Sequence, residues 1–153
     1  MPSFEKEFVE SKGAPIKYKK WEIIRTDRIA VQKKFSGTVK LISTNSEWQQ
    51  AVYLRVLSGN LKIDEDKGKA FVLWEDALNE GVIHFEGATK DLQLLVYNAW
   101  NQIDHLGTEF TNAWYHGAAM IVEVSGNTRR YRCNDGHPDD NFDDIVFEVT
   151  INE

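Results

Sequence analysis

Near the end of the chain stands the run Ile145-Val146-Phe147-Glu148-Val149-Thr150-Ile151, and this stretch decides the fold class. Its apolar residues occupy every second position, which is the period of a β-strand with one buried face and one solvated face. The residues just before it are rich in Asp, Asn, Gly and Pro, which favour turns. The run therefore predicts a strand that packs one side against a core.

The same alternation recurs upstream in 29–42 and 52–56, and 118–124 and 129–133 are further predicted strands on either side of the turn Ser125-Gly126-Asn127. Turn-forming residues separate such segments, and Asp64–Gly68 predicts a hairpin connection. Ser36-Gly37 predicts a bend or bulge inside the first segment. Many short strands with frequent turns favour a mainly β fold, an antiparallel β-sandwich or jelly roll with one or two short helices.

Two segments fit more than one type of secondary structure. Residues 46–57 fit either a strand or a helix capped by Asn45 or Ser46. Residues 91–106 carry apolar side chains close to helical spacing, with Gly107 at a plausible C-cap, and they alternate equally well as a strand. We favour the strand for 91–106.

Length and composition indicate one globular domain over residues 1–153, with 1–15 as a polar N-terminal arm. The hydrophobic content of 42% fits a packed core and argues against general disorder. Cys133 is the single cysteine, so an intrachain disulfide is excluded and a reducing compartment is favoured. No apolar run of signal-peptide length stands at the N-terminus. We expect a cytoplasmic protein, or one secreted without a classical signal peptide.

The net charge of −6 is unevenly distributed. Residues 134–153 hold seven acidic side chains and no Lys or Arg, whereas the first 133 residues hold 18 basic and 17 acidic ones. Residues 1–40 are the most basic part, but acidic side chains interrupt them throughout. This basic region is too dilute for a nucleic-acid interface, so we expect no nucleic-acid partner.

The acidic loop 134–144 holds five aspartates and two asparagines within eleven residues. Such density is repulsive without a counterion, and Ca²⁺ takes six to eight oxygen ligands of this kind. Zinc is disfavoured, because Cys133 and His137 are the only soft ligands nearby. A solvated acidic turn is the alternative. The candidate calcium ligands are Asp135, Asp139, Asp140, Asn141, Asp143 and Asp144.

The run Asp140–Phe147 resembles the calcium motif Asp-x-Asp-aromatic-Asn/Asp-Asp-aliphatic-Val-Phe of β-domains in bacterial surface proteins. Here Asn141 fills the variable position and Phe142 arrives one residue early. The resemblance implies a calcium-binding β-sandwich.

The pairs Asn134-Asp135 and Asp140-Asn141, followed by the strand Phe147–Ile151, are also similar to the end of bacterial galactophilic calcium lectins. Gly136-His137-Pro138 replaces the glycine-rich loop of those lectins. In them the ion contacts sugar hydroxyls directly, so the resemblance implies that Asp135, Asp140 and Asn141 hold both ion and sugar.

A third segment, Leu94–Gly107, is similar to a strand and loop of calcium-dependent membrane-binding sandwich domains. Asn98 and Asn101 stand where those domains place aspartates, which would weaken calcium binding there.

These patterns favour a calcium-dependent binding module for a carbohydrate or another small polar ligand, and we expect no enzymatic activity. The alternatives are an acidic or immunity-type protein that meets a basic protein partner, and a membrane-binding or pore-forming protein. In the favoured interpretation we expect no membrane contact. The sequence is compatible with a homo-oligomer. The candidate ligand-contacting residues are Trp114, Tyr115, His116 and His137.

Overall fold

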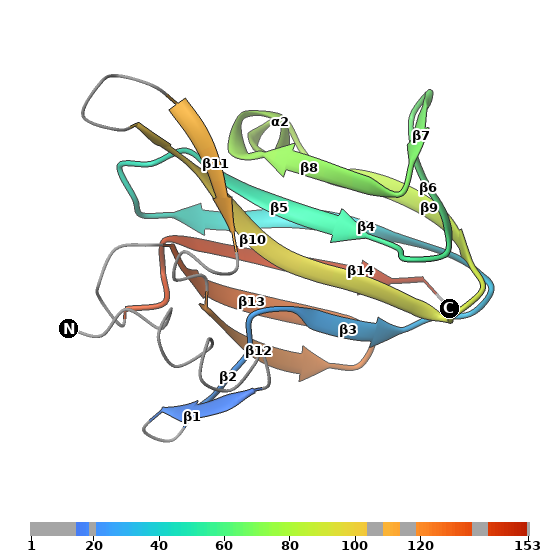
Figure 1. The fold of residues 1–153 in the computed structure, drawn as a ribbon, viewed down its shortest axis with the longest axis horizontal. Coiled ribbons are helices and arrows are strands. Elements are labelled where there is room, and N and C mark those ends of the chain that lie inside the picture. Colours follow the sequence, from blue (N-terminus) through green and yellow to red (C-terminus); the bar gives the residue numbers. More distant parts are fainter. Residues whose placement is uncertain (1–14, 19–20, 104–108, 114–118, 136–140, 153) are drawn as a thin grey trace.

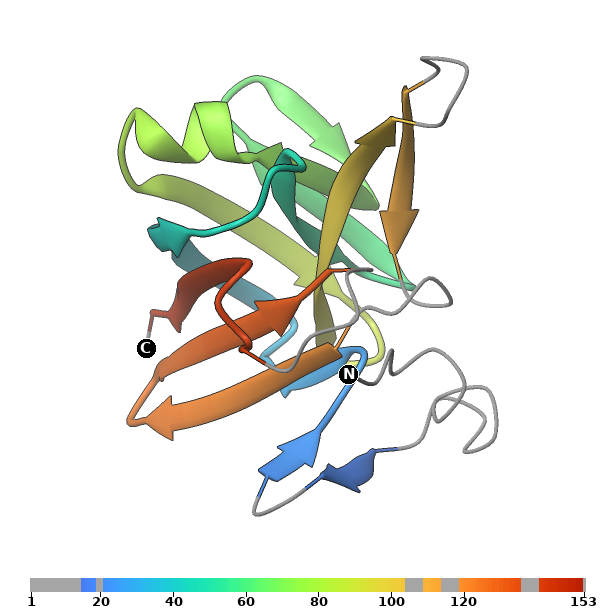
Figure 2. The ribbon, with the colours of Figure 1, turned by 90° about the vertical axis from the view of Figure 1, so that its left-hand side faces the viewer.

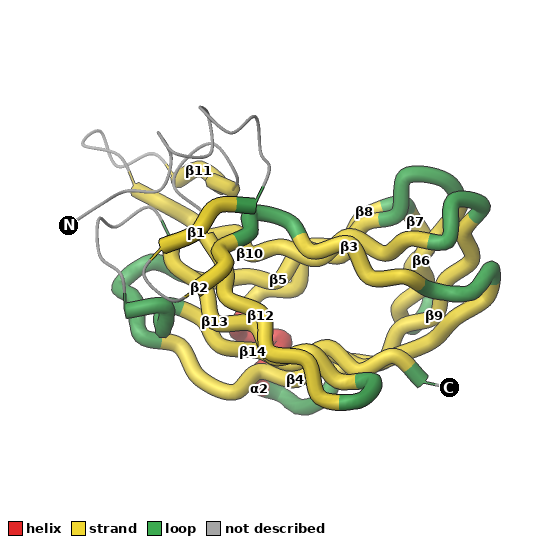
Figure 3. The backbone as a smooth tube through the Cα atoms, turned by 90° about the horizontal axis from the view of Figure 1, so that it is seen from below, coloured by secondary structure: helices red, strands yellow, loops and turns green. Residues whose placement is uncertain are grey.

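The structure, a computed structural model, describes residues 15–18, 21–103, 109–113, 119–135 and 141–152. Two antiparallel β-sheets pack face to face, with a short helix, α2 (Glu75–Asn79), beside them (Figure 1). Seen from below, the two sheets form two layers (Figure 3). The predicted mainly β sandwich is therefore confirmed. Among the described residues, no helix is both long and apolar enough to cross a membrane.

The larger sheet has seven strands, and the strand predicted from 145–151 lies inside it as β14. Its neighbours on either side are β13 and β4, and all pairs are antiparallel. In spatial order the strands are β12 (Ala119–Ser125), β13 (Thr128–Asn134), β14 (Ile145–Ile151), β4 (Lys34–Thr44), β9 (Ile83–Thr89), β6 (Gly59–Ile63) and β7 (Asp66–Gly68).

The smaller sheet has five strands built around β10. One edge of β10 pairs with β5, and its other edge pairs with β3 at one end and β11 at the other. Its strands are β11 (Glu109–Ala113), β10 (Gln93–Ile103), β5 (Gln50–Arg55), β8 (Ala70–Trp74) and β3 (Asp27–Ala30).

A separate hairpin, β1 (Ile16–Tyr18) with β2 (Trp21–Ile23), lies beside the orange strands β12 and β13 (Figure 2). Ile23 packs there against Ala119 and Ile121, on the outer face of the larger sheet. The main core lies between the two sheets and draws apolar side chains from both.

Both ambiguous segments are strands. Residues 50–55 form β5, so the helix alternative for 46–57 is wrong. The strand favoured within 91–106 is confirmed as β10, up to Ile103 where the description stops. Tertiary burial decides both cases, because the inward-facing residues Leu54, Leu94 and Val96 are fully buried against the opposite sheet.

Ser36-Gly37 forms neither a bend nor a bulge, because β4 runs continuously from Lys34 to Thr44. Phe35 lies opposite Gly87 on β9, and Gly37 lies opposite Phe85. A Cβ atom added at either glycine would overlap the facing ring. The two rings meet edge to face at 6.3 Å and 68°, a favoured aromatic geometry. Each glycine thus makes room for a phenylalanine across the strand pair.

The irregularity in β4 lies further along the strand. Val146 pairs with Ser43, and Phe147 pairs with Leu41, so Ile42 is an extra residue on β4. This is the two-against-one pattern of a β-bulge.

The hairpin predicted at Asp64–Gly68 is present, but Asp66–Gly68 are themselves a strand of it, and residues 70–74, expected as its second strand, pair elsewhere. It connects β6 to β7, and Asp64 adopts a left-handed φ of 52° in the turn. The next strand, β8, belongs to the other sheet. The chain therefore passes from the larger sheet to the smaller sheet within seven residues of the end of β6.

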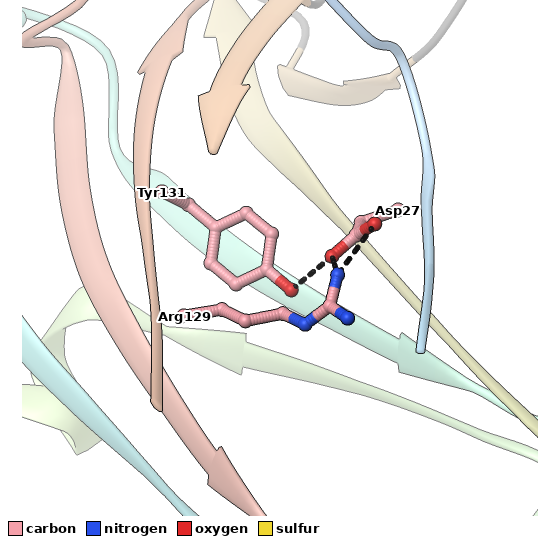
Figure 4. A network of polar contacts seen from close by, with 3 residues as sticks. All are labelled: Asp27, Arg129 and Tyr131. Atoms are coloured by element: carbon pink, nitrogen blue, oxygen red, sulfur yellow. Dashed lines mark hydrogen bonds and ion pairs between the residues drawn. The ribbon is translucent and has the colours of Figure 1, made fainter. Parts of the chain in front are cut away.

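A buried polar contact joins the two sheets at the β3 side (Figure 4). Asp27 on β3 accepts a 2.6 Å hydrogen bond from the Tyr131 hydroxyl and a 3.0 Å ion pair from Arg129, both on β13. Burial raises the pKa of Tyr131 well above its usual value, and the negative charge of Asp27 adds to the effect. The three side chains satisfy one another, which identifies this network as a structural link between the layers.

Candidate functional site

The core between the sheets becomes polar at one end. Along β10 the inward positions pass from Leu94 and Val96 to Asn98 and Trp100, and on β5 the corresponding inward residue is Gln50. Trp100 lies directly opposite Gln50 in the antiparallel register. Gln50, Asn98 and Trp100 are fully buried. The smaller sheet therefore presents two carboxamides and an indole toward the larger sheet.

The larger sheet contributes a buried carboxylate to the same end of the core. Asp135 follows β13 on the same face as Cys133 and has only 1% of its surface exposed. Its Oδ2 accepts hydrogen bonds from Ser46 Oγ at 2.6 Å and from Gln50 Nε2 at 3.0 Å. This carboxylate of the larger sheet thus forms a hydrogen bond across the core to Gln50, the first residue of β5.

A second buried carboxylate lies beside the first. Asp144, 3% exposed, immediately precedes β14, and its Oδ2 accepts a 2.9 Å hydrogen bond from the Asp135 backbone amide. The Asp144 amide in turn donates to the Cys133 carbonyl at 3.1 Å. The chain therefore leaves β13 and returns to β14 with both aspartates held at the same end of the sandwich.

The orientations of the two buried carboxamides are fixed by their donors. Gln50 Nε2 donates to Asp135 and to the Trp48 carbonyl at 3.0 Å, and Asn98 Nδ2 donates to the Asn134 carbonyl at 2.8 Å. Carbonyl oxygens only accept hydrogen bonds, so the amide nitrogens must face them. The oxygens Gln50 Oε1 and Asn98 Oδ1 are then left buried without a hydrogen-bond partner in the described structure.

An unsatisfied buried acceptor costs about 1–3 kcal/mol, so two of them in one place require an explanation. Trp100 Nε1 is a third buried polar atom without a partner in the described part of the chain. Oxygen acceptors of carboxamides are good ligands for hard cations. The indole N–H is a donor and cannot bind a cation. It is, however, a further polar group of this region that lacks a hydrogen-bond partner among the described residues.

Cys133 lies next to this cluster as a neutral group. Burial raises the pKa of its thiol well above the usual value, and the negative charge of Asp144 raises it further. The thiol is therefore protonated at neutral pH and is neither a nucleophile nor a soft metal ligand in this state.

Phe142 fixes the return of the chain into the site. Its backbone amide donates to Asn134 Oδ1 at 2.8 Å, and its side chain packs against Ile23, Ala119 and Ile121. Its φ is 54°, a left-handed conformation that is strained for a bulky residue. Strain of this kind persists only where the surroundings impose it, and it clusters at functional sites.

The structure brings together only part of the predicted calcium set. Asp135 and Asp144 meet, whereas Asp143 points to Asn45, whose Nδ2 donates to it at 2.8 Å, and Asn141 is exposed. Within the described ranges, no three His, Cys, Asp or Glu side chains are placed to hold a metal ion together. Six predicted site residues lie outside the described residues: Trp114, Tyr115, His116, His137, Asp139 and Asp140.

Sequence reasoning missed Gln50 as a site residue and noted Asn98 only through the membrane-domain similarity. The available signal was a polar residue at an inward position of an otherwise apolar strand. Trp48 was missed as well. It is half-buried and stacks on Trp100, with ring centroids 6.4 Å apart and planes 8° apart.

Comparison of the chain with protein-family models, with curated proteins and with solved structures finds no match. The chemistry of the site is what indicates a function: two carboxylates, two carboxamide oxygens and a partly exposed indole lie at one end of a β-sandwich.

Proposed function

We propose that the protein is a calcium-dependent binding module whose ion lies at the Asp135 end of the sandwich and whose ligand is a carbohydrate. One observation carries the proposal. The buried carboxylates of Asp135 and Asp144 lie in the same cluster as two buried carboxamide oxygens that have no hydrogen-bond partner. A cation would reduce the repulsion between the two carboxylates. It would also be coordinated by the lone pairs of the two carboxamide oxygens that have no hydrogen-bond partner.

The donor set favours calcium over other metals. Asp135, Asp144, Gln50 and Asn98 offer only oxygen, and Ca²⁺ accepts six to eight such ligands in a flexible geometry. Mg²⁺ requires a stricter octahedron. Zinc prefers thiolate and imidazole, and none of these four residues offers either group. Asp139, Asp140 and Asn141 remain the ligands that the sequence proposes in addition.

Trp48 supports the carbohydrate part of the proposal. Gln50 Nε2 donates to its carbonyl, so Trp48 lies beside the cluster, and its ring is held by stacking on Trp100. A partly exposed aromatic ring next to convergent polar groups is a common arrangement in binding sites for small polar molecules. Trp48 would contact the apolar face of a sugar whose hydroxyls meet the ion.

The ion is tested by thermal unfolding of the metal-stripped full chain during a Ca²⁺ titration, with Mg²⁺ in parallel. A hundredfold excess over the dissociation constant stabilises by about 2.7 kcal/mol. We expect this rise in the wild type and its loss in Asp144→Asn. The matched control is Asp27→Asn, which alters a buried, hydrogen-bonded aspartate at another place and should keep the calcium response. No response of the wild type at millimolar Ca²⁺ contradicts the proposal.

The ligand is tested separately, with a glycan array probed in Ca²⁺ and in EDTA. Binding should require Ca²⁺, and Trp48→Ala should lose glycan binding while its calcium-induced rise in Tm remains. Glycan binding that persists in EDTA would remove the shared-ion mechanism. A salt-sensitive complex with a basic protein, unaffected by EDTA, would instead favour the interaction-protein alternative.

A further inference from the structure

The outer face of the larger sheet carries a groove at the end far from Asp135. The groove has a volume of about 660 Å³, within the range of roughly 300–1,000 Å³ that small-molecule sites occupy. It lies over the beginning of β4 and the neighbouring parts of β9, β6 and β7, whereas the end of β4 leads to Asn45 and the acidic loop. Its charged lining residues are Lys34, Lys62, Lys67 and Glu86.

The strand register gathers the lysines on one face. Ser36, Glu86, Lys62 and Lys67 form a single row across β4, β9, β6 and β7, because each residue pairs directly with the next. Lys34 begins the adjacent row, which continues through Ala88 and Asn60. Before the bulge at Ile42, the even-numbered residues of β4 point outward, away from the core that buries Phe35 and Val39.

Lys62 and Lys67 are directly opposite each other on β6 and β7. Like charges at such cross-strand positions repel and destabilise the pair. In the described structure, none of the three groove lysines makes an ion pair within 4.0 Å of a carboxylate. The groove is lined by three lysines and one carboxylate, Glu86, on a chain whose net charge is −6. Asp64, which borders Lys62 and Glu86, and Asp66, which precedes Lys67, reduce the local positive charge, so the unpaired lysine ammonium groups themselves attract an anion here.

We propose that this groove binds an acidic oligosaccharide, a sugar chain that carries carboxylate or sulfate groups. Lysine ammonium groups are flexible point charges that suit such anions. Gln32, Asn60 and Asn152 supply carboxamides that pair with sugar hydroxyls. Asn152 is held in place by its Nδ2, which donates to Ser36 Oγ at 3.0 Å.

The spacing of the lysines favours a ligand that carries more than one acidic group. Lys34 and Lys62 are two strands and two residues apart, a backbone separation of about 12 Å from standard sheet spacings. Lys62 lies directly opposite Lys67, so one acidic group can meet this pair while a second meets Lys34.

Nucleic acid fits the groove less well than a saccharide. Phe35 is the one aromatic residue among the described lining residues, and its ring is buried against Gly87. Single-stranded nucleic acids need exposed rings on which bases stack. This inference is independent of the calcium proposal, because it concerns another face, another end of the sandwich and other residues.

The test is calorimetric titration of the full chain in EDTA, which removes the proposed calcium contribution. The probes are an oligogalacturonate, a sulfated dextran oligosaccharide and neutral dextran. We expect an acidic probe to bind, neutral dextran not to bind, and affinity to fall as salt rises. Lys62→Gln/Lys67→Gln should weaken binding at least tenfold. The matched control is Lys40→Gln/Lys69→Gln, which removes the same charge from two exposed lysines outside the groove and should bind like the wild type.

Three results would overturn the proposal. The first is no binding of either acidic probe at millimolar concentration and low salt. The lysines would then serve only to prevent another strand from pairing with the β7 edge. The second is equal weakening by the control pair. The third is equally tight binding of poly-glutamate, which would show that the groove reads charge and not saccharide. The substitutions are on the surface, so circular dichroism should show an unchanged fold.

Discussion

The Tyr131 hydroxyl donates a 2.6 Å hydrogen bond to Asp27 Oδ2, and this bond joins β13 of the larger sheet to β3 of the smaller one. Tyr131 is fully buried and stacks on Phe147 at 4.8 Å, so its ring would keep its place without the hydroxyl. The hydroxyl and the ring therefore make separable contributions to stability.

Tyr131→Phe should lower the free energy of unfolding by about 1.5–3 kcal/mol, the range for a hydrogen bond to a charged group. Urea denaturation measures it. The double variant with Asp27→Asn should lose less than the sum of the two single losses, because Asp27→Asn removes the charge that strengthens the same hydrogen bond. Additive losses would show that the bond contributes little.

The stability of the protein should depend on pH in the alkaline range through Tyr97. Burial raises the pKa of Tyr97 from 10.0 to about 12, and the neighbouring Tyr53, stacked at 4.5 Å, adds to the effect. A raised pKa means that the folded state favours the neutral phenol, so this contribution is complete below pH 10 and is lost as pH rises through about 12.

We therefore expect the free energy of unfolding to fall between pH 10 and 12, and to fall less steeply in Tyr97→Phe. The remaining slope in that variant should come from Tyr131 and Cys133, whose pKa values are also raised by burial. Urea midpoints at several alkaline pH values measure both slopes. Identical slopes in the wild type and Tyr97→Phe would contradict this assignment.

Gly87→Ala should destabilise the protein by about 1–3 kcal/mol, the usual cost of overpacking. The added Cβ would overlap the Phe35 ring, which cannot move away from its edge-to-face contact with Phe85 without losing it. Gly68→Ala is the matched control, because its added Cβ would meet nothing closer than the Ala70 carbonyl at 3.9 Å. Thermal unfolding of both variants decides the matter, and equal Tm values would refute the packing argument.

Cys133 should react with a thiol reagent only when the protein unfolds. Its side chain is fully buried, and its raised pKa keeps the thiolate fraction small. Absorbance of released thionitrobenzoate at pH 8 should show slow modification of the native chain and rapid modification in urea. Fast reaction of the native chain would mean that the β13–β14 region opens locally.

Local patterns predicted the strands well. Residues 145–151 alternate cleanly, and β14 has those bounds. The turn-forming residues Ser125-Gly126-Asn127 do connect β12 to β13, and Gly126 adopts a φ of 62° there. Period and turn chemistry are properties of neighbouring residues, so one sequence suffices to detect them.

The partners across the sheets were not predictable in the same way. Gln50 and Trp100 are fifty residues apart and meet only because β5 and β10 pair in one particular register. The acidic loop was visible as a cluster, but the sequence did not tell that Asp135 would face inward to Gln50 while Asp143 would turn to Asn45. Gly37 likewise predicted a bulge, because the sequence alone does not show that Phe85 lies opposite to it on β9.

If the two proposed sites both bind, the length of β4 sets the distance between their ligands. This strand has 11 residues, and at about 3.3 Å per residue it spans roughly 33 Å between the lysine groove and the acidic end. A rigid strand inside a sheet neither stretches nor folds back. Two ligands held by one molecule would therefore be kept a fixed distance apart, so the chain would behave as a cross-linker between separate saccharides.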